Sequence, residues 1–233
     1  MEMKRFFLPP ILRKMRRPLA FDTEKDKQEA REKITDAKKC VQTAKQKLTD
    51  AIELSQAIES QKPSPKRKKE GERVVKKYLY QAKNEAYLAV YLLTQAVRLY
   101  PGCKEFVLAD SFEARLHVED AVILLRHPVW AYFGLDALVD DIEKAVRNNP
   151  DKDIEPVFQN LLAYAYTRRS FVATHLISKN TGAPFLIIDM LQPAADLEKS
   201  CEIYASLGNQ GQASRAGERM NKYLFSLFNP PEL

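Results

Sequence analysis

The chain has 233 residues, of which 45% are hydrophobic, so it is long enough for one large domain or two small ones. It contains only 7 glycines and no phosphate-binding or dinucleotide-binding motif, which argues against enzyme classes built on glycine-rich turns. The formal net charge is +6, but residues 1–20 and residues 62–69 each contribute +5, leaving the remainder at −4. Two local clusters favour docking onto an acidic partner or membrane surface, or a targeting signal, over a nucleic-acid-binding face.

Residues 1–21 form a basic, apolar arm that three prolines prevent from being one continuous helix. Its composition is compatible with an organelle-targeting segment, a peripheral contact with an anionic membrane, an extended arm along a partner protein, or a disordered tail. We favour the docking arm and the targeting segment, with a plastid or mitochondrion as the location. The candidate docking cations of the arm are Lys4, Arg5, Arg13, Lys14, Arg16 and Arg17.

A long helical hairpin is expected over residues 22–100. Apolar residues follow a three-four spacing through residues 22–61, from Ile34 to Ile58, and again through residues 72–100, from Val75 to Leu99. In the second helix this spacing places Tyr78, Glu85 and Leu92 on the seam. Two such helices predict an antiparallel pair about 60 Å long.

The basic run at residues 62–70 is predicted to be the turn of this hairpin, because Pro63 and Pro65 stop the first helix. It is interpreted as a solvated tip, as an electrostatic docking tip, or as a nuclear-import signal. The third interpretation supports an alternative function, a nuclear or nucleic-acid-associated helical protein. The candidate docking cations of the run are Lys62, Lys66, Arg67, Lys68 and Lys69.

Residues 106–228 are predicted to form an antiparallel helical bundle packed beside the hairpin, so the fold class is all-α. Helices are expected at 110–126, from Pro128 to about 146, and at 155–178, 184–207 and 212–228, with Pro193 at a kink or at a new start. In the helix at 155–178, Val157, Leu161, Tyr164, Phe171, Val172 and His175 are the expected inward positions. In the last helix, Ala213, Ala216, Met220, Leu224 and Leu227 are expected to be buried.

Few residues occur in patterns that indicate catalysis or metal binding. His117 follows Glu113 by four residues, but no second copy completes a carboxylate-bridged metal site. His127 is expected to cap or pack at a helix break, and His175 to be a hydrogen-bonded core histidine. The three cysteines show no metal or redox spacing. We therefore predict no catalytic, metal or cofactor-binding residues and a protein that is not an enzyme, with an enzyme whose site forms only in the folded chain as a third hypothesis.

Two aromatic segments are further candidates for contacts. Tyr164, Tyr166, Arg168 and Arg169 have the residue types that stack on bases, although core-plus-surface packing is the preferred interpretation. Trp130 would be an interface anchor if exposed, but its apolar surroundings favour a buried position.

Residues 119–228 resemble the PsbQ-like extrinsic subunits of photosystem II, which are four-helix bundles of the thylakoid lumen. The resemblance is carried by "LLRHPVWAYFGLDALVDDIEKAV" and "ADLEKSCEIYASLGNQGQASRAGERMNKYLFSL". It implies a subunit of a thylakoid-type complex, although the long hairpin and the basic arm depart from that family. The predicted function is a non-catalytic subunit or assembly factor that docks onto a larger complex through its arm and hairpin tip. No apolar run in the sequence reaches the length of a transmembrane helix.

Overall fold

The computed structural model describes residues 23–61, 63–148, 155–178 and 188–228, and every regular element in these ranges is helical. Seven α-helices and one short 3-10 helix follow one another: α1 (Glu24–Gln61), α2 (Pro65–Leu99), η2 (Pro101–Cys103), α3 (Lys104–Leu124), α4 (Pro128–Asn148), α5 (Glu155–Ser178), α6 (Gln192–Ser206) and α7 (Gln210–Phe228). The predicted all-α fold is confirmed. None of the described helices combines the length and apolar character that crossing a membrane requires.

The predicted hairpin is formed by α1 and α2. Thr23 caps α1, because its hydroxyl accepts a hydrogen bond from the Asp26 backbone N–H at 3.2 Å while the Asp26 carboxylate accepts one from the Thr23 N–H. The buried positions of α1 follow the predicted seam: Ala37, Val41, Ala44, Leu48 and Ala51, with Ala30 one step before it. Small alanines at this seam let the two helix backbones approach closely.

The buried stripe of α2 contains part of the predicted seam and is broader than it. Ala82, Ala89 and Ala96 of the seam are buried, whereas Tyr78, Glu85 and Leu92 are only partly covered. The neighbouring positions Leu79, Ala86 and Leu93 are buried as well. The stripe is wide because α2 packs on two partners, α1 and α3.

The basic run is helical rather than a turn, which corrects the prediction for residues 66–70. Pro63 and Ser64 precede α2, and Pro65 opens it. Proline is well accommodated in the first helical turn because the N–H that it lacks has no helical partner there. Lysine and arginine are also good helix formers, so the run continues into α2. Near the turn, a Cβ on Gly71 would lie 2.6 Å from the Ile58 side chain, so glycine permits this close approach.

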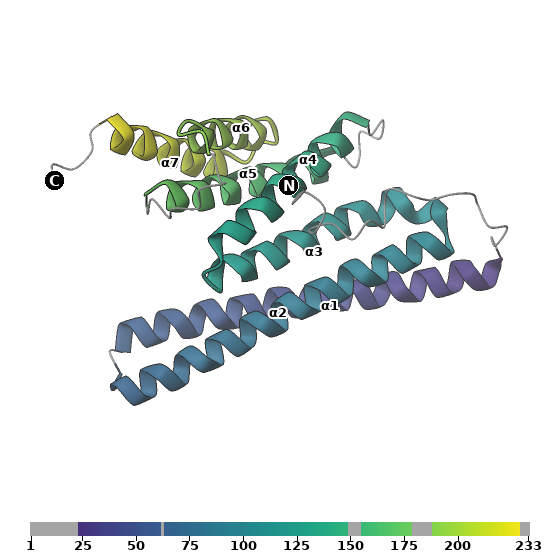
Figure 1. Cartoon of the computed structure of the whole chain (residues 1–233). Helices are drawn as coiled ribbons and strands as arrows, with labels where there is room; N and C mark the ends of the chain where they lie inside the picture. The colour runs from purple at the N-terminus through teal and green to yellow at the C-terminus, as the bar shows by residue number, and fades with distance from the viewer. Residues whose placement is uncertain (1–22, 62, 149–154, 179–187, 229–233) are drawn as a thin grey trace, which may run out of the picture.

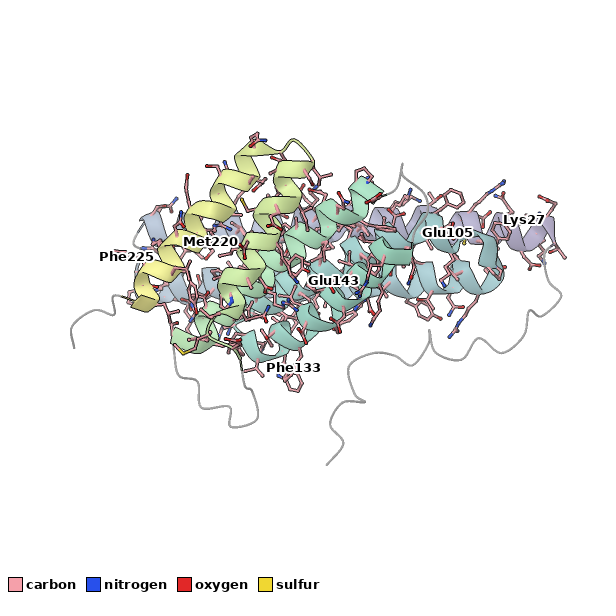
Figure 2. All side chains as sticks on the ribbon, turned by 90° about the horizontal axis from the view of Figure 1, so that it is seen from above. Lys27, Glu105, Phe133, Glu143, Met220 and Phe225 are labelled. Carbon is pink, nitrogen blue, oxygen red and sulfur yellow. The ribbon has the colours of Figure 1, made fainter. Side chains whose placement is uncertain are left out.

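The remaining helices pack mainly on their neighbours in sequence. Figure 1 shows the hairpin on one side, α6 and α7 on the other, and α3, α4 and α5 between them. Seen from above, α6 and α7 cross the direction of the hairpin (Figure 2). The largest hydrophobic cluster joins α3, α4 and α5, with Phe112, Leu135, Leu138, Ile142 and Phe158 among its buried members.

Several predicted details of the bundle differ from the structure. α3 begins six residues before the expected start. Pro193 lies in the first turn of α6, so it marks a new start, while residues 184–187 lie outside the described ranges. In α5, Val157 and Phe171 are exposed, and Phe158, Leu162 and Tyr166 are buried instead. Ala213 and Ala216 of α7 are buried as expected, and Met220, Leu224 and Leu227 are partly buried.

Candidate functional site

The tip of the hairpin carries the described part of the predicted docking cluster. Lys66, Arg67, Lys68 and Lys69 occupy the beginning of α2, are all exposed, and make no ion pair with any residue that the structure describes. α3 ends at the level of Leu79, since Ala121 shares a buried cluster with Leu79 and Ala82. The first turns of α2 therefore extend past α3, as Figure 1 shows. The remaining predicted cations, Lys4, Arg5, Arg13, Lys14, Arg16, Arg17 and Lys62, lie outside the described residues.

Trp130 is 53% exposed in the first turn of α4, so its predicted burial is wrong. The core face of α4 is formed by Ala131, Leu135 and Leu138, and Trp130 lies one residue before that stripe. Phe133, three residues further, is also exposed and points away from the ribbon in Figure 2. α4 packs on α3 and α5, so the structure does not bring Trp130 together with the basic tip.

A longer feature on α2, which the sequence analysis missed, continues the tip. Residues spaced by three, four or seven share one side of a helix. All members of this set are exposed, the tyrosines by 47–57%. We call this set the α2 outer face: Lys66, Lys69, Arg73, Lys77, Tyr80, Tyr87 and Tyr91.

The α2 outer face has a cationic half next to the tip and an aromatic half further along. Tyr80 is already covered in part by the Lys83 ammonium, which lies 5.2 Å from the ring centroid. Exposed tyrosines at helical spacing offer large, rigid contact area with a hydroxyl that bonds polar groups. The arrangement is suited to binding an extended or helical partner along α2.

A second candidate, the polar cluster around Arg169, is buried inside the bundle. The Arg169 guanidinium donates to both carboxylate oxygens of Asp196, at 2.9 and 2.8 Å, and to Asp136 at 2.7 Å. Gln192 donates to the same Asp196 carboxylate at 2.7 Å. Burial opposes the charge of Arg169, but the bonds to Asp196 and the charge of Asp136 outweigh it and raise the pKa of Arg169. The cluster ties α5 to α4 and α6.

The neighbouring aromatic residues of α5 are also engaged internally. The Tyr164 hydroxyl donates to Asp120 at 2.8 Å, and Arg168 Nε lies 2.8 Å from Asp120. Tyr166 donates to Glu143, and burial together with that bond raises the pKa of Tyr166. These side chains hold helices together, which agrees with the preferred core-plus-surface interpretation.

Glu119 and His117 on α3 lie in surroundings that are unusual for ionisable side chains. Burial raises the pKa of Glu119 to about 8, with Asp120 adding to the effect and Arg115 opposing it. Neither ring nitrogen of His117 has a hydrogen-bond partner among the described residues, and Nε2 lies 3.8 Å from Glu113. Glu113 is the acid that faces this ring, and His117 lowers the pKa of the Glu113 carboxyl.

The other two histidines lie at helix ends or edges. His127 directly precedes α4, and its backbone carbonyl accepts a hydrogen bond from the Ala131 N–H at 3.1 Å. His175 is only half-buried and lines a groove, so the predicted core position is wrong. The described residues contain no group of three or more side chains able to hold a metal ion.

The cysteines are free thiols. Cys103 shares a buried cluster with Ala30, and Cys40 packs at its edge. Burial and the adjacent Glu85 raise the pKa of Cys40 to about 11. This thiol is therefore protonated at neutral pH and is a poor nucleophile.

Comparisons with protein-family models, with curated proteins and with solved structures found no match to this chain. The resemblance of residues 119–228 to PsbQ-like subunits therefore stays a prediction.

Proposed function

We propose that this protein is a non-catalytic helical docking subunit that binds an acidic protein surface along the α2 outer face. The observation that carries the proposal is the continuity of that face. Four cations and three tyrosines lie on one exposed side of a single helix. The cations supply long-range attraction, and the tyrosines supply the anchoring contacts that interfaces favour.

The position of the cations supports a binding role over a purely structural one. The first turn of α2 contains no acidic residue, and the free N–H groups of a helix start already create a positive potential. Cations at this end each disfavour the isolated helix by about 0.3–1 kcal/mol. An acidic partner removes that repulsion, so its binding stabilises the tip.

The direct test is co-purification from the native source at low and high salt, followed by mass spectrometry. The variant Lys66→Glu, Lys69→Glu and Arg73→Glu is compared with a control that reverses three exposed cations elsewhere, Lys25, Arg31 and Lys144. We expect an acidic protein that is retained at low salt by the native chain and the control and is lost at high salt. Equal retention by both variants would refute the role of the α2 outer face.

A nucleic-acid partner is the second candidate, because alternating cations and exposed aromatic rings also suit single-stranded nucleic acids. Fluorescence anisotropy with an oligouridylate probe distinguishes the two. This candidate predicts salt-dependent binding that weakens when Tyr80, Tyr87 and Tyr91 are replaced by alanine. Absence of salt-dependent binding removes it. An organellar location stays a prediction that rests on the arm.

A further inference from the structure

Two grooves lie on either side of α5. The first has a volume of about 740 Å³ and runs between α1, the end of α3 and α5. It forms because α1 and α5 both pack on α3 and leave space between them. Ile52, Leu124 and Phe171 line it from three different helices and are 40–58% exposed. This groove therefore gathers apolar side chains that the fold leaves uncovered.

The second groove has a volume of about 520 Å³ and lies between α5 and α7. Its polar lining consists of hydroxyl groups, among them Thr167 and Thr174, and of cations, among them Arg219 and Lys222. No carboxylate is among the described residues that line it. Arg219 and Lys222 are exposed and make no ion pair with a described residue.

The two grooves meet at Arg168 and Phe171, which line both of them. Arg168 contacts Tyr164 and Asp120 through Nε at 2.8 Å, and its guanidinium carbon lies 4.9 Å from the centroid of the Tyr164 ring. The terminal nitrogens of this guanidinium make no hydrogen bond within the described part of the chain, so their N–H groups are available to a ligand. The negative charge of Asp120, which lines the first groove, is balanced by its ion pair with Arg168.

We propose that the joined grooves bind one amphipathic anion with a single alkyl chain. The chain lies on Ile52, Leu124 and Phe171, and the carboxylate or phosphate head lies among Arg168, Arg219 and Lys222. Charge complementarity supports an anion, because Arg126, Arg168, Arg219 and Lys222 surround the grooves and Asp120 is the acid among their described lining residues. The volumes fall in the range of ordinary ligand sites. The proposal is independent of the α2 outer face, since no residue is shared.

Isothermal titration calorimetry at low salt and below micelle formation tests the chemistry, with decyl phosphate and decanoate as probes. Decanol carries the chain without the charge, and inorganic phosphate carries the charge without the chain. We expect one molecule of decyl phosphate or decanoate per chain, bound at least ~10-fold more tightly than decanol or phosphate. No binding of either anion, or equal binding of decanol or inorganic phosphate, overturns the proposal.

Variants then locate the site. Replacing Arg219 and Lys222 by serine should weaken decyl phosphate binding roughly tenfold, because charge-assisted hydrogen bonds are lost. The matched control replaces Arg98 and Lys144, exposed cations on α2 and α4, by serine, and it should bind decyl phosphate as tightly as the native chain.

The apolar part of the site is tested separately. Phe171→Asp places a like charge where the grooves meet and should abolish binding, whereas Phe106→Asp, at an exposed position outside both grooves, should not. Both phenylalanines are exposed, so circular dichroism should show all variants folded. Equal effects of the site and control variants would overturn the proposal.

Discussion

The Arg169–Asp196 pair offers a sharp test of the bundle, because it is a charged contact in a buried place. Asp196 is 0% exposed and Arg169 is 7% exposed. Asp196→Ala removes both bonds to the guanidinium and also the acceptor of Gln192. The half-exposed Asp136 remains as the partner of Nη1. Breaking one side of a buried pair costs about 3–5 kcal/mol, because the Arg169 charge stays buried and keeps only its contact with Asp136.

That cost corresponds to a fall in melting temperature of about 6–20 °C for a chain of this size. Arg169→Met combined with Asp196→Leu removes both charges together. Because apolar replacements of buried pairs are often neutral or stabilising, the double variant should recover most of the loss. The single substitutions Arg169→Met and Asp196→Leu should thus be strongly non-additive relative to this double variant, with a coupling of about 2 kcal/mol or more.

Urea unfolding followed by circular dichroism measures these free energies for the native chain, the single variants and the double variant. An exposed pair provides the control: Asp36→Ala removes the 3.0 Å contact with Lys39 and should change the free energy of unfolding by less than ~0.5 kcal/mol. The reasoning fails if Asp196→Ala costs no more than this control. It also fails if the double variant loses the sum of the single losses.

Three further predictions concern single groups. Glu119 has a folded pKa of about 8, above its ordinary value of 4.5, so the folded state retains a proton that the unfolded state releases. The contribution of this proton to the free energy of unfolding is complete below pH 4.5 and is lost as the pH rises through 8. At 1.36 kcal/mol per pH unit, the total loss is at most about 5 kcal/mol. Glu119→Gln should flatten this decline in unfolding experiments between pH 5 and 9, and parallel curves would contradict it. His117→Leu removes two buried nitrogens without a hydrogen bond, together with the 3.8 Å contact to Glu113, and should raise the melting temperature by about 2–4 °C, whereas a decrease would show that the contact with Glu113 contributes more. Arg126→Gly should stabilise the fold by about 1 kcal/mol, because Arg126 has a φ of 64° where α3 ends; unchanged unfolding would show that this backbone is not strained.

The sequence predicts α1 well because that helix buries one stripe against its neighbours, and a three-four spacing describes one stripe. α5 contacts α3, α4 and α6, so it is buried on several sides and has no single apolar face. The expected inward positions Val157 and Phe171 were wrong for this reason. The start of α2 was misplaced because prolines and cations resemble a turn, although proline also opens helices.

The candidate surfaces differ in whether they depend on residue spacing within one helix or on contacts between helices that are distant in sequence. The α2 outer face was within reach of the sequence, since its tyrosines follow the helical period on the side opposite the buried alanines Ala82, Ala89 and Ala96. The contact of Arg169 with Asp196 joins residues 27 positions apart on different helices. The grooves beside α5 lie between helices that do not pack directly on each other. The spacing of apolar residues along the sequence does not predict which helices these are.

The packing of each helix on its sequence neighbours has a consequence for how the chain folds. Most contacts are formed between segments close in sequence, so little loop entropy must be lost before they form, and rapid folding is expected. The same arrangement leaves α7 packed chiefly on α6, at one end of the array. Amide hydrogen exchange should therefore be fastest in α7 and slowest in α3 to α5, where each helix is held from more than one side.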